Sequence, residues 1–108
     1  MMEIKFRVWD KKNLKMYYDY ETHAYFSDQL CNPDLEIMQF TGLKDKNGKE
    51  IYEGDILKYD LGKFCKGQGK IFWFECSYVV YDLGVLSLNV ANHGEVIGNI
   101  YENLELIK

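Results

Sequence analysis

The chain has 108 residues, of which 47% are hydrophobic, 28% charged and 16% aromatic, and its formal net charge is −4. This length fits a single domain, and this composition is that of a globular protein, which excludes a disordered chain. Non-specific nucleic-acid affinity comes mostly from phosphate neutralisation, so the acidic balance argues against a general nucleic-acid binder, although a local basic surface escapes that average. The high aromatic content favours β structure, because Tyr, Phe and Trp pack well on pleated surfaces.

Three features of the sequence predict the cellular compartment of the protein. The three cysteines are odd in number and lack CxxC spacing, which is typical neither of a disulfide framework nor of a zinc site and predicts reduced thiols. The first residues show no basic segment followed by an apolar one, so we expect no secretory signal. No apolar run approaches the ~18 residues of a membrane span. We therefore expect a cytoplasmic protein with no membrane partner.

The first half of the chain predicts a β-hairpin followed by a further strand. Residues 4–9 follow a pattern that repeats every two residues, which is typical of a strand with one buried face. A polar turn at 10–13 separates them from a second, aromatic strand at 15–20, and two strands joined by a short turn predict a hairpin. Residues 21–34 are expected to form a loop, and residues 36–41 return to a strand pattern.

The second half predicts a small barrel. A glycine-rich, lysine-bearing stretch at 62–69 predicts a flexible loop, and the apolar run at 71–80 predicts one central strand that bends. Further short strands are expected at 85–90 and 95–100. Short strands at this spacing, separated by Gly and Asn turns, are typical of a small barrel or rolled sheet. No helix longer than two turns is predicted.

Three segments, taken in this order and spacing, resemble one protein family. They are FRVWD followed by MYY near the start, the long segment FTGLKDKNGKEIYEGDI in the middle, and VIGNIYEN near the end. Together they resemble the YopX family, small proteins encoded by bacteriophages and prophages, over nearly the whole chain. The family often has a proline directly after the last segment, where this chain has Leu104.

The resemblance implies a mostly-β fold, in which an N-terminal β-hairpin segment (residues 1–50) packs on a C-terminal SH3-like small barrel (residues 51–108) as one compact unit. It also implies a phage or prophage origin, an accessory role and the cytoplasm of a bacterial host cell. It brings no catalytic residue and no cofactor, so we expect none. The glycines Gly42, Gly48 and Gly54 of the middle segment stand where a strand must stop or turn, so this segment is interpreted first as a folding signature.

The residue types that most often carry catalysis form no recognised arrangement. His23 and His93 are far apart in sequence and lack HxxxH or CxxC partners, so no metal site is predicted. Glu53 and Asp55 flank a turn glycine, where bonds to backbone or water are expected rather than acid–base chemistry. Gly67–Lys70 lacks the spacing and the following helix of a phosphate loop. We therefore expect a protein that is not an enzyme.

Four tyrosines in and after the first hairpin are the first candidate binding surface. Two faces of one hairpin cannot both enter a small core, so some of these rings are expected to remain exposed, and exposed tyrosines often anchor protein interfaces. They are Tyr17, Tyr18, Tyr20 and Tyr25. The first hypothesis is therefore a non-catalytic module that binds a protein partner from host or phage, or associates with itself as a homo-oligomer.

Lysines interleaved with aromatic residues are the second candidate surface. A surface that combines positive charge and exposed aromatic rings suits single-stranded nucleic acid, which is the alternative function. Its residues are Lys58, Lys63, Lys66, Lys70 and Trp73, with Phe64 and Phe72 between them. The opposing interpretation is a solvated loop over a core that buries these rings. Burial decides between the two, because a ring inside a barrel cannot stack on a base.

Overall fold

The computed structural model describes residues 5–18, 33–63, 65–74, 77–81, 83–103 and 105. The chain is mostly β, as predicted. The strands are β1 (Phe6–Asp10), β2 (Lys15–Tyr17), β3 (Leu35–Lys44), β4 (Glu50–Tyr52), β5 (Asp55–Asp60), β6 (Lys66–Phe74), β7 (Ser77–Val80), β8 (Gly84–Val85) and β9 (Gly94–Asn99), and the α-helix α3 spans Leu88–Asn92.

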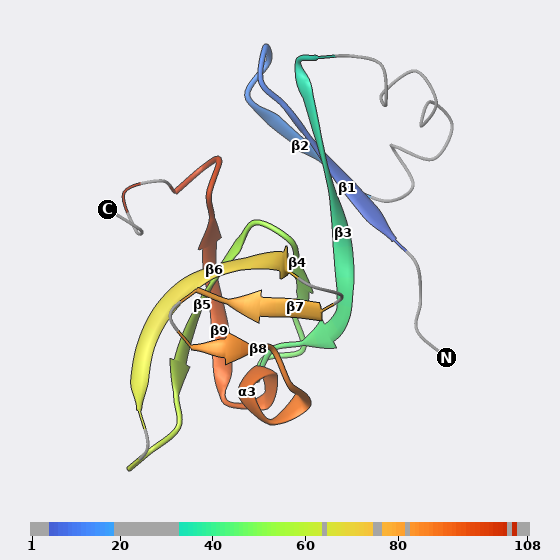
Figure 1. Ribbon diagram of the computed structural model, residues 1–108. Helices are drawn as coiled ribbons and strands as arrows, with labels where there is room; N and C mark the ends of the chain where they lie inside the picture. The colour runs from blue at the N-terminus through green and yellow to red at the C-terminus, as the bar shows by residue number, and fades with distance from the viewer. Residues whose placement is uncertain are drawn as a thin grey trace.

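The strands form two sheets that follow each other along the chain. The first has four strands in the order β2-β1-β3-β4, and the second has five in the order β8-β7-β6-β5-β9. Figure 1 shows the second sheet curling into a small half-barrel, with β6 as its long curved strand, and β3 extending from the first hairpin down to it. The predicted fold class, an N-terminal hairpin segment packed on a small SH3-like barrel, is confirmed.

The predicted first hairpin is present and its turn is closed by one carboxylate. β1 and β2 are antiparallel, with Val8 opposite Tyr17. Asp10 accepts the backbone N–H groups of Lys12 at 2.9 Å and of Asn13 at 3.1 Å. These bonds, most strongly the one from Asn13, hold the pKa of the Asp10 carboxyl below its usual range. The predicted loop at 21–34 lies almost wholly outside the described residues.

The barrel core follows from strand alternation. Burial alternates along the second half of β5: Leu57 and Tyr59 are buried, whereas Lys58 and Asp60 are exposed. This is the pattern of a strand with one face toward a core, since successive side chains point to opposite faces. The buried residues of the core cluster are Ile51, Leu57, Tyr59, Ile71, Val80, Leu86, Val90, Ala91 and Val96.

The predicted flexible loop at 62–69 is wrong in its second part, because β6 already begins at Lys66. The two glycines in this stretch serve close packing against neighbouring segments. A Cβ atom on Gly67 would lie 3.0 Å from the Tyr59 hydroxyl, and one on Gly69 would lie 2.5 Å from the backbone oxygen of Tyr81. Gly67–Lys70 therefore lies in a strand, which excludes the phosphate-loop interpretation.

The last part of the barrel also differs from the predicted elements. The apolar run at 71–80 forms parts of two antiparallel strands, with Phe74 opposite Ser77, in place of one bent strand. The predicted strand at 85–90 is largely replaced by helix α3. Ser87 caps this helix, because its hydroxyl accepts the backbone N–H of Val90 at 3.3 Å. An apolar run by itself does not distinguish one strand from two.

The exposed edge of β9 is closed by the Asn-Gly turn of the middle segment. Lys46 donates its backbone N–H to the carbonyl of Gly94 at 2.9 Å. The Asp45 carboxylate accepts the backbone N–H of Val96 at 2.9 Å. An open strand edge is a template for pairing with another chain, so this turn removes β9 as such a template.

Replacing Gly69 by alanine is expected to lower the free energy of unfolding by about 1–3 kcal/mol. The added methyl group would overlap the backbone oxygen of Tyr81, and β6 and the segment after β7 must separate to admit it. Urea denaturation followed by fluorescence measures the change. Lys66→Ala, an exposed substitution on the same strand, is the control and should stay within about 0.5 kcal/mol of the parent. Equal stability of both variants would contradict the close approach at Gly69.

Candidate functional site

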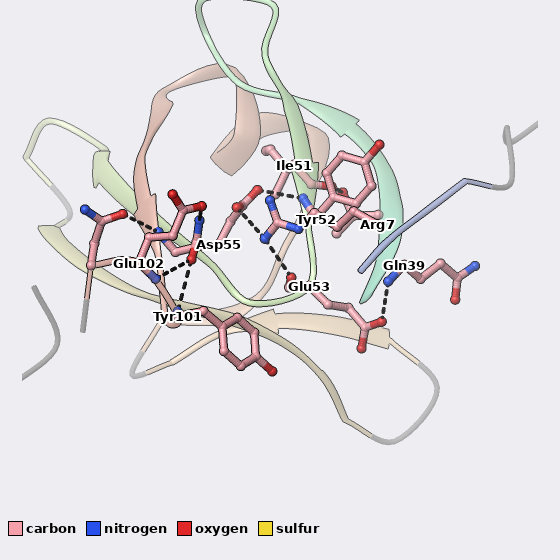
Figure 2. A network of polar contacts seen from close by, with 11 residues as sticks. Arg7, Gln39, Ile51, Tyr52, Glu53, Asp55, Tyr101 and Glu102 are labelled. Atoms are coloured by element: carbon pink, nitrogen blue, oxygen red, sulfur yellow. Dashed lines mark hydrogen bonds and ion pairs between the residues drawn. The ribbon is translucent and has the colours of Figure 1, made fainter. Parts of the chain in front are cut away.

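An ion pair between Arg7 of β1 and Asp55 of β5 joins the two sheets. The Nη2 atom of Arg7 lies 2.8 Å from Oδ1 of Asp55, and each side chain is only 2% exposed. The same Nη2 donates to the carbonyl oxygen of Glu53 at 3.1 Å, and Oδ2 of Asp55 accepts the backbone N–H of Tyr52 at 2.8 Å. Figure 2 shows these contacts converging between β1 and the β4–β5 connection.

Burial shapes the electrostatics of this pair. Desolvation raises the pKa of the Asp55 carboxyl, and the Arg7 guanidinium and the Tyr52 N–H partly offset that rise. The Arg7 guanidinium also lies 4.9 Å from the centre of the Tyr52 ring, and its Nε is buried without a hydrogen-bond partner in the described chain. Both oxygens of Asp55 already accept contacts. We therefore interpret the pair as a link between the sheets.

A polar cavity of about 360 Å³ lies beside the pair. Its lining includes the cations Arg7 and Lys49 and the anions Asp55 and Glu102. Glu102 already accepts a hydrogen bond from the Asn99 side chain at 3.0 Å. Charges of both signs line the cavity, and two of the four are already paired with each other, so it selects no ligand charge.

The remaining candidates for chemistry are separated in the structure. Glu53 accepts the backbone N–H of Gln39 at 2.7 Å and so does not face Asp55 across an open site. His93 is exposed and its Nδ1 lies 2.8 Å from the carbonyl oxygen of Asn89, while His23 lies outside the described residues. Within the described residues no group of three or more His, Cys, Asp or Glu side chains is placed to hold a metal ion.

Only two of the four predicted interface tyrosines lie in the described part of the chain. Tyr17 is half-buried, with Lys15 Nζ 4.9 Å from its ring centre. Tyr18 is 45% exposed and its ring packs edge-on against Tyr52 at 5.9 Å between centres. Tyr20 and Tyr25 fall outside the described residues. The hairpin therefore presents one exposed tyrosine there, and the tyrosine interface stays a prediction.

Exposed apolar side chains also occur on the second sheet and at the start of α3. They are Trp73 and Phe74 at the end of β6, Tyr81 directly after β7, Val85 on β8 and Leu88 on α3, each more than half exposed, and we name them together the hairpin-end surface. Within the run at 71–80, Ile71 and Val80 are buried, but the hairpin continues beyond the core that they fill. Trp73 packs edge-on against Tyr78 and Phe74 against Phe72. The mostly apolar run, in which Glu75 is the one charged residue, left open which of its rings are exposed.

The predicted lysine and aromatic residues are divided between the two faces of the barrel wall. Lys58 and Lys66 are exposed on β5 and β6, Lys63 is exposed in the connection between them, and Lys70 is half-buried. Trp73 follows Ile71 by two positions and therefore shares the core-side face of β6, opposite the lysines. Phe64 lies outside the described residues. The interpretation that the core buries these rings fails for Trp73, which is 54% exposed.

These features define a small, mostly-β protein of two curled sheets with exposed apolar side chains, exposed lysines and one buried ion pair. Residues 19–108 match the family model described as YopX protein, and the chain belongs to the YopX family. The crystal structure of protein EF1440 from Enterococcus faecalis is similar over the full length of both chains, with a TM-score of 0.73 and 28% sequence identity. No curated protein matches the chain. Within the described residues, no helix has the length and apolarity needed to cross a membrane.

Proposed function

We propose that this YopX-family chain is a non-catalytic module that associates with a second copy of itself through the hairpin-end surface. The observation that carries the proposal is the exposure there of five large apolar side chains, of which Trp73 is the largest. Soluble proteins seldom expose such side chains together unless a partner covers them, and aromatic residues are the commonest anchors of interfaces. The phage or prophage accessory role stays a prediction of the resemblance.

The charge distribution favours a second copy as the partner. In a two-fold interface the same surface meets itself, so a charge near the axis faces its like. The chain carries a net charge of −4, and residues 71–74, Ser77–Val80 and Gly84–Val85 contain no charged residue, while Glu75 and Asp82 adjoin these segments in the sequence. Two copies can bring the uncharged segments together in an arrangement that keeps Glu75 and Asp82 away from the two-fold axis.

Side-chain packing, rather than strand pairing, is the contact that the second sheet favours. The turn at Asp45 closes the edge of β9, and β8 has only two residues on which a further strand could pair. Trp73 and Phe74 point to opposite faces of their strand, so the hairpin end is apolar on both faces. A second hairpin end packed alongside would cover both rings.

Light scattering after size-exclusion chromatography tests the proposal. The full chain should be a dimer or larger assembly at about 100 µM and should dissociate on dilution. Trp73→Asp and Val85→Asp should each be monomeric at that concentration, because two introduced carboxylates would meet across the interface.

Leu14→Asp is the matched control. Leu14 is 72% exposed but lies in the β1–β2 turn, away from the hairpin-end surface, so this variant should assemble as the parent does. A parent chain that stays monomeric at every concentration would overturn self-association. Assembly that survives both Trp73→Asp and Val85→Asp would move the interface elsewhere, and the tyrosine hairpin would then be the next candidate.

A further inference from the structure

We propose that the outer face of β5 and β6 binds single-stranded nucleic acid. We name this the lysine face, and its residues are Lys58, Lys66, Lys70, Phe72 and Phe74. Phe74 belongs to both this face and the hairpin-end surface, so the test below measures binding in Trp73→Asp as well as in the parent chain.

Strand alternation puts these five side chains on one face. On β6, Lys66, Lys70, Phe72 and Phe74 are separated by even numbers of residues, and Gln68 stands between the two lysines. Lys58 on β5 is opposite Gln68 in the antiparallel register, so it joins the same face. Ile71, Leu57 and Tyr59 occupy the other face and fill the core.

The lysines of this face are free to bind an anion. The ion pairs between described residues engage Lys5, Arg7 and Lys11, and Lys58, Lys66 and Lys70 form none. Two carboxylates on β5 and β9 reduce the positive charge of the face, because Asp60 is in register with Lys66 and Glu95 with Lys58. We therefore expect modest affinity that depends steeply on salt, as for contacts made mainly to phosphates.

The aromatic end of the face supplies stacking surfaces. Phe74 is 55% exposed, and its ring centre lies 6.4 Å from that of Phe72 at an interplanar angle of 66°. Lys70 Nζ lies 5.7 Å from the centre of the Phe72 ring. Lys70 and Phe72 also line a recess of about 180 Å³ together with Glu53, Ile37, Ile100 and Tyr101. Bases stack on such rings without sequence preference.

The regular spacing favours nucleic acid over an acidic protein segment. Residues two apart on a strand are separated by roughly 7 Å, so the face offers positive charge and aromatic rings in repeating steps along β6. A single strand repeats a phosphate and a base with every nucleotide and can use both kinds of contact. The residues proposed to contact nucleic acid therefore differ from those predicted from the sequence. Phe72 and Phe74 replace Trp73, which lies on the opposite face.

Fluorescence anisotropy with a labelled oligothymidylate of about 15 nucleotides at about 20 mM salt tests the proposal. The full chain should bind with a dissociation constant of about 10–50 µM. The double variant Lys58→Gln/Lys66→Gln should weaken binding at least about tenfold and reduce the salt slope by about two. Phe74→Ala should weaken binding about fivefold or more, since a stacking surface is lost.

Matched controls distinguish binding by the lysine face from an effect of the total charge and from an effect of self-association. Lys12→Gln/Lys46→Gln removes the same charge from exposed lysines off the face and should keep binding within about twofold. Trp73→Asp, which should disrupt the dimer, should still bind the oligonucleotide. No binding at about 50 µM protein, or equal loss in both double variants, would overturn the proposal. Tighter binding to a labelled poly-glutamate peptide than to the oligonucleotide would also overturn it, in favour of an acidic protein partner.

Discussion

Replacing Asp55 by alanine is expected to lower the free energy of unfolding by about 3–5 kcal/mol. The substitution leaves the Arg7 guanidinium buried without its counter-charge, and arginine cannot lose its proton to escape that cost. It also removes the acceptor of the Tyr52 backbone N–H. Urea denaturation followed through the fluorescence of buried Trp9 measures the loss.

A second substitution shows whether the loss comes from the unpaired charge. The double variant Arg7→Met/Asp55→Ala removes both charges and should recover part of the stability that Asp55→Ala loses, because no uncompensated ion remains in the interior. Lys58→Ala, an exposed change on the same strand, is the control and should cost less than about 0.5 kcal/mol. A double variant no more stable than Asp55→Ala would contradict the assignment.

The pH dependence of an Arg7 variant gives an independent check on the same pair. Burial raises the pKa of the Asp55 carboxyl, and Arg7 opposes that rise. A carboxyl whose pKa is raised by folding binds its proton more tightly in the folded state, so its contribution to stability decreases as pH rises through that pKa. Arg7→Met removes the opposing charge and raises the pKa of Asp55 further.

Arg7→Met should therefore lower the free energy of unfolding by less at about pH 5 than at about pH 8, as measured by urea denaturation at both pH values. A deficit that does not change with pH would mean that Asp55 does not titrate differently in the two proteins, and would contradict the proposed coupling.

Replacing Asp45 by alanine is expected to cost about 2–4 kcal/mol, the second largest effect. Its carboxylate is 95% buried and accepts three backbone N–H groups: those of Asn47 and Lys49 within the turn, and that of Val96 on β9. Alanine leaves the Val96 N–H buried without an acceptor and releases the turn from the edge of the barrel. Thermal and urea unfolding measure the loss.

The same variant also tests how the edge of β9 is protected. Asp45→Ala should increase aggregation on mild heating, because the uncovered edge of β9 can pair with other chains. Lys46→Ala changes the neighbouring exposed side chain and keeps the three hydrogen bonds of Asp45, so it is the control. Equal stability and equal aggregation of the two variants would show that the turn does not protect the edge.

The buried junction and the hairpin-end surface were the parts of the protein least visible to sequence reasoning. Glu53 and Asp55 were recognised as a close pair of carboxylates, but their partners Gln39 and Arg7 come from other strands and follow no local pattern. The run at 71–80 predicted one central strand that bends, and it left the burial of Phe72 and Trp73 open because apolar side chains look the same in the sequence whether the core covers them or not. Exposure depends on where the core ends, which is a property of the assembled sheets.

By itself, the sequence determined the features that depend on neighbouring residues. The alternation at 4–9, the Asp10 turn and the Asn-Gly turn identified the mostly-β class and the first hairpin, because turn conformation is decided by side chains within a few positions. The family was identified by the resemblance of three sequence segments. The tertiary structure alone decided that Gly67 and Gly69 lie in a strand, since glycine serves a loop and a close approach of backbones equally well. It also decided which lysines share a face with Phe72 and Phe74, because that depends on strand register across the sheet.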